Sequence, residues 1–528
     1  MKAWLKKERW IKGAKGDEGS FPMLAAIMMV LLIFAGLSFL KWGADENFEA
    51  MRAERKLQAY YVAHAGLTNW GFNYLLDLDP STIPPYRREL KKDGLVKDRY
   101  GAIVGRVDVW TAPNNLNEGG TGFADFSYVD VGATGKVDII TDDGEEYSIR
   151  DSILVTVKLL SLSQFLYLTN HETTIFNEVI KFWGADTLDG WVHSNDTISM
   201  MGGGGGPGPV FYDHVSTTAP FINVISGNPQ YLGGPPWLNY REIQLPTMAM
   251  EVRNAASSMG LFFDDDGTFP NDRASRLIFD GNQGWKLYQW DIGAPWDSSE
   301  AELHASGGPP TWQAIFVEGY LEIKGIVKGQ VTVGAAGNSD PQAVGKHCMR
   351  LVDDVRYWFA DSISGRFNDT TGNFMDILGL VSEGDIVVAN TYANGKDNGK
   401  FVTPTGMWRH SILINAAMVA LGESFTFEDQ NDNYNWEYST GYLGTQVDER
   451  GDIRLVGSVT QFRRGYVHRN NHGAPGGGPP GGTGYGKQYH YDARFDFMAP
   501  PYFIQVADEE GDAQFEIVSW GHWENKTP

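Results

Sequence analysis

The stretch GSFPMLAAIMMVLLIFAGLSFLKW, residues 19–42, decides how the rest of this chain is organised. Residues 21–40 are apolar except for Pro22, Gly36 and Ser38. A helix of this length rises about 30 Å, which matches the hydrocarbon core of a bilayer. A cleaved secretory signal has a shorter apolar region, followed by a small-residue cleavage site. The stretch therefore predicts a transmembrane helix.

Charge is distributed unevenly on the two sides of this helix. The leader before Gly19 carries six Lys and Arg residues against three acidic residues, whereas the whole chain has a net charge of -23. By the positive-inside rule, the N-terminus is expected in the cytoplasm and the acidic bulk outside. The acidic surface also argues against nucleic-acid binding. The lone Cys348 excludes an intramolecular disulfide framework, so the exported part must be held by packing, backbone pairing or a bound ion.

The chain continues as helix beyond the apolar stretch. Small, apolar and aromatic residues recur at three- and four-residue spacing, which predicts one helix from about Pro22 to Leu76. We assign residues 1–19 to a leader and 20–78 to this helical segment. The proline-bearing run DPSTIPPYRRELKKDG then ends the helix.

Residues 79–160 predict a small β-sheet. The β-like runs are GRVDVW, FSYVDVGATGKVDII and EEYSIRDSILVTVKLL, separated by turn signals such as TDDGEE. A chain of 528 residues is too long for one compact core, so a further domain is expected.

Residues 161–528 predict a large, mainly β domain. In AIFVEGYLEIKGIVKGQVTVGAAGN, the residues Gly319, Gly325 and Gly329 punctuate brief strands. Closely spaced glycines suit the tight corners of a parallel β-helix, with the irregular segments as loops on one face. An antiparallel β-sandwich is the alternative. The expected fold class is therefore α+β.

A charged leader that ends in glycine, followed by an apolar and then an amphipathic half-helix, resembles type IV pilins and pseudopilins. The resemblance rests on Gly19-Ser20-Phe21, on the apolar stretch and on KLQAYYVAHAGL. It implies that a prepilin peptidase cuts after Gly19 and leaves Ser20 as the new N-terminus. It also implies that the small sheet of residues 79–160 is antiparallel and packs against the helix, as in pilin heads. Major pilins carry a glutamate at the fifth mature position, where this chain has Leu24. That difference is typical of minor or tip subunits.

The large domain resembles an uncharacterised family of bacterial exported β-rich proteins. The resemblance rests on Asp189-Gly190, His193-Ser194-Asn195, VEGYLEIKGIVKGQVTV, LGLVSEGDIVV and GSVTQFRRG, in this order. It implies an architecture and a location, because the function of that family is not established.

No catalytic residues are expected. His193 and Ser194 are neighbours on a strand and point to opposite faces, so the triplet with Asn195 predicts a polar corner or an asparagine stack on a coil, and no catalytic pair. Asp492, Arg494 and Asp496 alternate and could share one face of a strand, but no second motif converges on them.

Two acidic segments concentrate oxygen ligands as calcium loops do, and the histidines lack zinc-like spacing. Calcium is therefore the one cofactor that the sequence suggests; the alternative is a pair of solvated acidic turns. The candidate ligands are Asp264, Asp266, Asp429, Asn431 and Asn433.

The sequence predicts a structural or adhesive pilin-like subunit, a minor or tip component of a type IV pilus-type surface filament. Its expected partners are other pilin subunits, prepilin peptidase and the assembly machinery. It would lie in the inner membrane before assembly and in a surface filament afterwards. The alternatives are a permanently anchored surface protein and a tethered carbohydrate-active β-helix enzyme.

Overall fold

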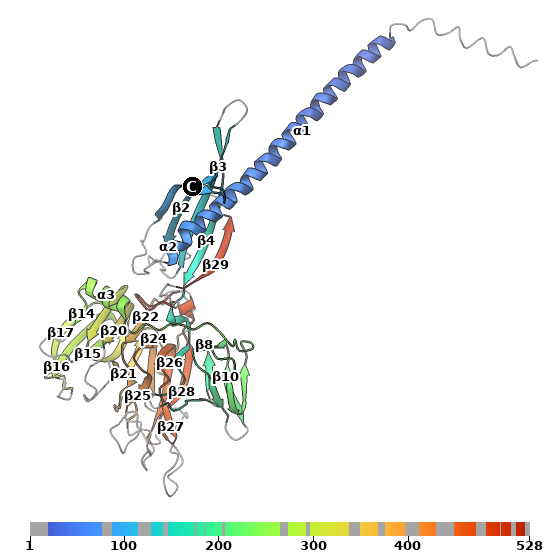
Figure 1. The fold of residues 1–528 in the computed structure, drawn as a ribbon. Helices are drawn as coiled ribbons and strands as arrows, with labels where there is room; N and C mark the ends of the chain where they lie inside the picture. Colours follow the sequence, from blue (N-terminus) through green and yellow to red (C-terminus); the bar gives the residue numbers. More distant parts are fainter. Residues whose placement is uncertain are drawn as a thin grey trace, which may run out of the picture.

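The computed structural model describes residues 20–76, 87–113, 128–140, 146–174, 177–184, 186–202, 206–263, 273–291, 296–336, 349–367, 375–396, 411–428, 448–470, 482–496, 498–507 and 514–522. A long helix projects from a small sheet, and a larger β-rich body lies beyond that sheet (Figure 1).

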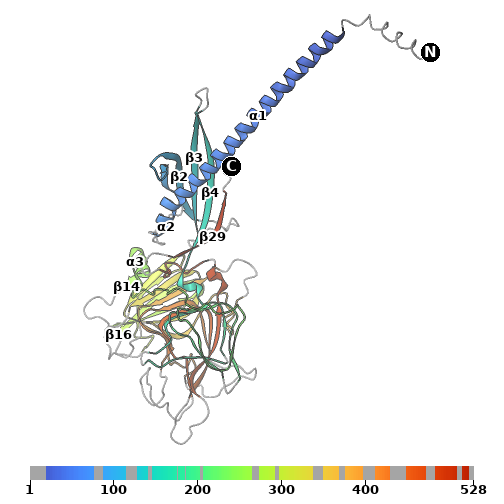
Figure 2. The ribbon, with the colours of Figure 1, turned by 45° about the vertical axis from the view of Figure 1, so that its right-hand side comes forward.

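The helical path predicted from the sequence is present. It consists of α1 (Ser20–Gly66), the π-helical turn η1 (Leu67–Phe72) and α2 (Asn73–Leu76). The half of α1 before Trp42 contacts no other described element, and its large apolar side chains are exposed. From Ala59 onward the helix lies across a sheet, as Figure 2 shows. One helix therefore has two different surroundings.

The small sheet is antiparallel throughout and has the order β1-β2-β3-β4-β29. Its helix-facing side carries a run of valines and isoleucines that forms one core with Ala59, Val62, Ala63 and Leu67. Its strands are β1 (Arg88–Lys97), β2 (Ile103–Pro113), β3 (Tyr128–Ile140), β4 (Glu146–Leu159) and β29 (Phe515–His522).

Glycines let the helix approach the sheet closely. A Cβ atom at Gly135 of β3 would lie 2.0 Å from the carbonyl oxygen of Ala59, and one at Gly66 of α1 would lie 2.5 Å from Val107. Real Cβ atoms do not approach other atoms so closely, so a side chain at either position would push the helix away from the sheet.

The fifth strand of the small sheet comes from the C-terminal end of the chain. The sequence assigned Phe515–His522 to the 161–528 domain, but β29 pairs with β4. Trp520 and His522 lie opposite Val155 and Ile153, on the helix side of the sheet, and stack on helix residues. Strand pairing over such a separation leaves no local signal in the sequence.

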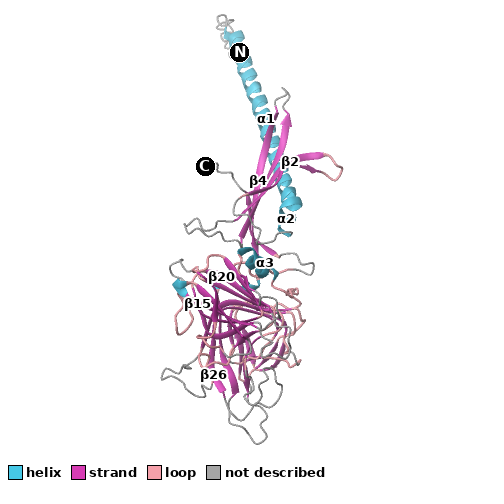
Figure 3. Cartoon of the chain, turned by 90° about the vertical axis from the view of Figure 1, so that its left-hand side faces the viewer, coloured by secondary structure: helices cyan, strands magenta, loops and turns pink. Residues whose placement is uncertain are grey.

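The body is mostly β, with short strands in stacked layers (Figure 3). Its first half contains β5 (Tyr167–His171), β6 (Phe182–Trp183), β7 (Thr187–Asp189), β8 (Val192–Ser194), β9 (Ser199–Met201), β10 (Pro207–Phe211), β11 (Val215–Thr217), β12 (Asn223–Ser226) and β13 (Asn228–Tyr231).

The second half begins with α3 (Met250–Met259). It continues through β14 (Phe262–Phe263), β15 (Arg273–Asp280), β16 (Trp285–Asp291), β17 (Glu302–Gly307), β18 (Gln313–Glu318), β19 (Tyr320–Val327), β20 (Gln330–Ala336), β21 (Met349–Tyr357), β22 (Ile377–Ser382), β23 (Ile386–Val388), β24 (Ile412–Ala420), β25 (Phe425–Phe427), β26 (Asp448–Arg463), β27 (His468–Asn470) and β28 (Gly482–Tyr491).

One column of parallel strands runs through the body in the order β14-β18-β20-β22-β24-β26-β5-β8-β11. The chain enters this column at β5 and runs outward to β11. It then crosses to α3 and β14 at the opposite end, and returns strand by strand until β26 meets β5. Antiparallel pairing in the described part of the body is confined to β15-β16-β17, the β27–β28 hairpin and isolated bridges.

Both faces of the column are buried. In β24, Ile412, Ile414 and Met418 belong to one apolar cluster, while Ala417 and Val419 belong to a second cluster on the other side. Strands buried on both faces need near-continuous apolar runs, which is what the sequence has here.

Gly319 and Gly329 lie at turns between strands, whereas Gly325, which was also expected between strands, lies within β19 beside an irregularity in its pairing with β21. Gly319, Gly325 and Gly329 have φ values of 117°, 114° and 113°. A Cβ atom at Gly325 would also lie 2.0 Å from the carbonyl oxygen of Phe279 in the neighbouring layer. These residues therefore allow both the sharp turn and the close stacking of layers.

Replacing Gly135 with alanine is expected to loosen the helix from the sheet, because the new methyl group would meet the Ala59 carbonyl. We expect a loss of about 1–3 kcal/mol in the stability of the small sheet. Hydrogen exchange of the β3 amides in the full-length chain in detergent measures this. Gly521→Ala is the matched control, because a Cβ atom there would meet nothing within 4 Å. Equal protection of β3 in the two variants would contradict the prediction.

Candidate functional site

The first candidate site is the exposed half of α1. The helix α1 begins at Ser20, whereas Gly19 lies outside the described residues. The processing site therefore stays a prediction. The helix is long and apolar enough to cross a membrane, by length and composition. Its first charged residue is Lys41, so the whole stretch before it offers only apolar contacts.

The second half of the helix is held by aromatic rings as well as by the sheet. His64 lies 5.3 Å from Trp520 between ring centroids, and Tyr60 lies 5.0 Å from His522. Phe72 stacks on Phe515 at 6.0 Å. The C-terminal strand therefore fixes the end of the helix that leads into the body.

The second candidate site is a group of buried polar residues where β26 meets β5, here called the seam cluster. It consists of Tyr167, Glu172, Asp186, Gln461, Arg464 and Lys487.

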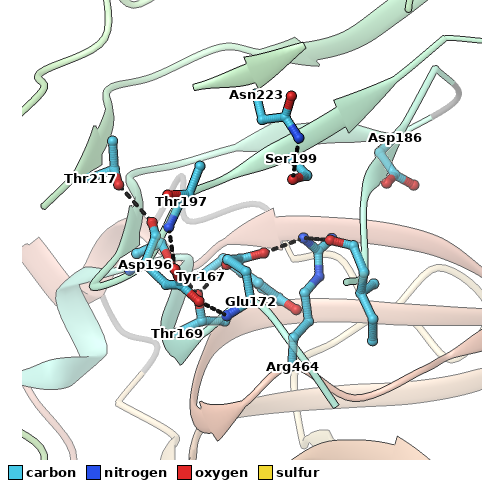
Figure 4. Close-up of polar contacts among 12 residues, drawn as sticks. Tyr167, Thr169, Glu172, Asp186, Asp196, Thr197, Ser199, Thr217, Asn223 and Arg464 are labelled. Atoms are coloured by element: carbon cyan, nitrogen blue, oxygen red, sulfur yellow. Dashed lines mark hydrogen bonds and ion pairs between the residues drawn. The ribbon is translucent and has the colours of Figure 1, made fainter. Parts of the chain in front are cut away.

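Each contact of the seam cluster joins the two halves of the body. The Arg464 Nη1 atom donates to Glu172 Oε2 at 2.6 Å, as Figure 4 shows. The Gln461 amide donates to the Tyr167 hydroxyl at 2.6 Å.

The Arg464–Glu172 pair is almost completely shielded from water, with side chains 1% and 2% exposed. Burial is the largest influence and lowers the pKa of Arg464, but Glu172, Tyr167 and Asp186 together raise the pKa of the guanidinium above its ordinary value. The guanidinium also lies 3.7 Å from the centre of the Phe182 ring. The pair is thus a fixed structural charge pair at the junction.

A small pocket opens beside the seam cluster, lined by Asp186, Arg464, Lys487 and several aromatic and apolar residues. Lys487 Nζ lies 3.2 Å from Asp186 Oδ2. Desolvation lowers the pKa of this lysine, with Arg464 acting in the same direction and Asp186 opposing both. Arg464 and Lys487 are already paired with Glu172 and Asp186, so the charged side chains of the seam cluster neutralise one another.

A ladder of hydroxyl groups continues from the seam cluster through three stacked strands. Thr169, Ser194 and Thr217 are in register on β5, β8 and β11. Thr169 hydrogen-bonds Glu172, and its hydroxyl lies 3.0 Å from that of Ser194. The Thr217 hydroxyl donates to the Asp196 carbonyl at 2.7 Å (Figure 4). This ladder was not predicted from the sequence, although a recurrence of polar triplets about every 24 residues could have indicated it.

His193 is completely buried and its ring nitrogens are both satisfied. The Asn195 side-chain amide donates to Asn170 and to the Ile243 carbonyl, so its oxygen must accept from His193 Nε2 at 2.9 Å. His193 Nδ1 then accepts from the Ser216 hydroxyl at 2.8 Å. Ser194 takes part in the hydroxyl ladder and does not contact His193. The triplet therefore forms a polar corner, as the sequence suggested.

The expected alternation of Asp492, Arg494 and Asp496 on a strand is wrong. Residues Ala493–Asp496 form a 3-10 turn, because Asp492 Oδ1 accepts the backbone N–H of Arg494. Arg494 also donates to both oxygens of Asp492, at 2.9 and 2.6 Å. The two side chains are engaged with each other inside the body.

The calcium candidates Asp264, Asp266, Asp429, Asn431 and Asn433 all lie outside the described residues. Calcium binding there stays a prediction. Within the described ranges, no group of three or more His, Cys, Asp and Glu residues could hold a metal ion.

Comparison with known proteins does not assign this chain to a family. No protein-family model and no curated protein matches the sequence. Among solved structures, the chain is similar to the competence-associated pilin ComZ from Thermus thermophilus, with 11% identity and a TM-score of 0.27 over 89% of this chain and 97% of that chain. A likeness at this level establishes neither a shared fold nor a shared function.

Replacing Arg464 with leucine is expected to open the seam, because Glu172 would be left buried and unpaired. Breaking a buried pair in this way costs about 3–5 kcal/mol. Hydrogen exchange of the β5 amides reports the loss. The control is Arg106→Leu, which removes an exposed pair with Asp138 and costs at most about 1 kcal/mol. If the β5 amides are equally protected from exchange in the two variants, the Arg464–Glu172 pair does not stabilise the junction of β26 with β5.

Acid is expected to weaken the body through His193. Burial, partly offset by the Asn195 hydrogen bond, lowers the pKa of His193 to about 4, below its ordinary 6.5. Its contribution is complete above pH 6.5 and is lost as the unfolded chain takes up protons between pH 6.5 and pH 4. The loss is on the order of 3 kcal/mol.

Urea unfolding of the wild type and His193→Gln, each at pH 7 and pH 4, tests this. The glutamine keeps a donor but does not titrate, so the gap between the two proteins should narrow in acid. His64→Gln, at an exposed histidine of α1, is the matched control. A gap that stays the same at both pH values contradicts the prediction.

Proposed function

We propose that this chain is a pilin-like subunit. Its helix would lie in the inner membrane before assembly, with the N-terminus inside and the acidic body outside, and would pack among other subunits of a surface filament afterwards. The leader would be removed after Gly19. The work of the body is then structural or adhesive, without catalytic residues.

One observation carries the proposal: a single helix is bare and apolar in its first half and packed on a sheet in its second half. A plain membrane anchor needs no such rigid continuation. A helix that must leave the bilayer and enter a filament needs a rigid continuation, because the body has to move together with the helix. Leu24, where major pilins carry glutamate, supports a role as a minor or tip subunit.

Two finer features belong to this proposal. The parallel column, with glycines at its corners, supports a β-solenoid for the body. Calcium bound by Asp264, Asp266, Asp429, Asn431 and Asn433 would stabilise loops of a chain that has a single cysteine. The first partners would be other pilin subunits, prepilin peptidase and the assembly machinery.

The first experiment is to determine the intact mass and N-terminal sequence of the protein recovered from membranes and from sheared surface material. We expect the sheared material to contain a chain that begins at Ser20. Gly19→Ile should block cleavage and keep the chain in the membrane, because the peptidase would no longer meet a glycine at the cut. Gly16→Ile, in the same leader, is the matched control and should be processed normally.

A wild-type chain that begins at Met1 and occurs only in membranes would overturn the proposal. The helix would then be a permanent anchor, and the body would act at the membrane surface.

A further inference from the structure

The body ends differently at its two extremes. At the β14 end, α3 packs against β18 and the antiparallel strands β15, β16 and β17 extend the sheet. At the other end the last layer consists of residues 219–240, here called the terminal coil. In this coil β13 pairs with β10, β12 pairs with β9, and Trp237 bridges Ser216. No described strand pairs with the coil on its outer side.

The terminal coil has an unusual composition. Residues 215–240 contain no Asp, Glu, Lys, Arg or His, which makes this the longest charge-free run in a chain of net charge -23. It is longer than the apolar membrane stretch itself. Proteins usually protect exposed strand edges with charged side chains, and this edge has none.

The coil is also open to solvent. None of residues 220–240 is buried. Six large apolar side chains in it are between 41% and 58% exposed: Phe221, Val224, Ile225, Leu232, Trp237 and Leu238. Such an apolar, uncharged patch marks a surface that another molecule covers.

The two outer strands of the coil are not equally able to pair. The N–H of Leu232 points inward to the Phe211 carbonyl, so Pro229, three residues earlier, occupies an outward position without an N–H. The outer edge of β13 is therefore blunted. In β12 the N–H of Asn223 points inward to the Ile198 carbonyl, which leaves the N–H and C=O of Val224 directed outward. β12 is the edge that can accept a strand.

We propose that the terminal coil binds the terminal coil of a second copy of this chain, with the two β12 strands antiparallel about a two-fold axis. In this arrangement each strand completes the other's free edge, and Val224 and Ile225 pack against their counterparts. Elsewhere, two copies of so acidic a chain repel each other, and the charge-free coil is the surface where they can meet. The inference does not depend on cleavage of the leader.

The test uses the full-length chain reconstituted at one copy per lipid nanodisc. Separate discs keep the membrane helices apart, so pairing of discs must pass through the body. We expect light scattering to show discs in pairs for the wild type. Val224→Asp should weaken pairing by about tenfold or more, because two like charges would face each other across the axis. Leu303→Asp, at an exposed leucine of β17 on the covered end, is the matched control and should pair as the wild type does.

A second measurement locates the contact. Val224→Cys, made in a Cys348→Ser background, should give a disulfide-linked dimer on mild oxidation, because the two residues 224 lie opposite each other, and Leu303→Cys in the same background should not. Single discs for the wild type at all concentrations would overturn the proposal. So would pairing that Val224→Asp leaves unchanged. Discs that remain single but bind neutral oligosaccharides through Trp237 would also overturn it and assign the coil to a glycan.

Discussion

The parallel pairing of β26 with β5, and of β28 with β7, is the contact on which the body depends. The chain enters its main column in the middle, so among the described strands these two pairings alone join the outward half and the returning half into one stack. Buried polar contacts occupy it: Arg464 with Glu172 and Gln461 with Tyr167. Such contacts are costly to bury unless every partner is in place, and they therefore favour one register of the two halves over its neighbours.

The same junction sets an order of events. The strands from β5 to β13 are synthesised before the rest of the body, and β5 has no partner on its inner edge until β26 is made, almost three hundred residues later. The small sheet likewise lacks β29 until the end of the chain is present. Contacts of such long sequence separation form late in folding. The helix is therefore fully held only when the body is complete, since Trp520 and His522 come from the last described strand.

Local features of this fold could be predicted from the sequence, and long-range features could not. The helix over residues 20–76 follows from an apolar stretch and a three- and four-residue spacing, and the turns at Gly319 and Gly329 follow from glycines between short strand-like runs. The pairing of β29 with β4 joins residues more than three hundred positions apart, and the sequence of neither strand indicates which strand it pairs with.

The candidate sites follow the same rule. His193 could be read as a polar corner because its neighbours alternate along a strand. The Arg464–Glu172 pair could not be foreseen, because a lone arginine and a lone glutamate carry no sign of each other. Alternating charged residues at 492–496 are compatible with a strand and with a turn, so the sequence alone does not distinguish them. The turn at Ala493–Asp496 forms because Asp492 accepts the backbone N–H of Arg494.

The bare half of α1 determines where the whole molecule can be. Between Met23 and Trp42, 14 large apolar side chains are exposed. At about 1.5 kcal/mol or more for each, covering them is worth on the order of 20 kcal/mol, which exceeds the stability of a typical domain, about 5–15 kcal/mol. The small sheet begins to cover the helix only near Ala59, so this energy must come from a bilayer or from other helices. Gly66 and Gly135 let the second half of the helix lie tightly on the sheet. The sheet and the body must therefore move with the helix, whether its first half lies in a bilayer or among other helices.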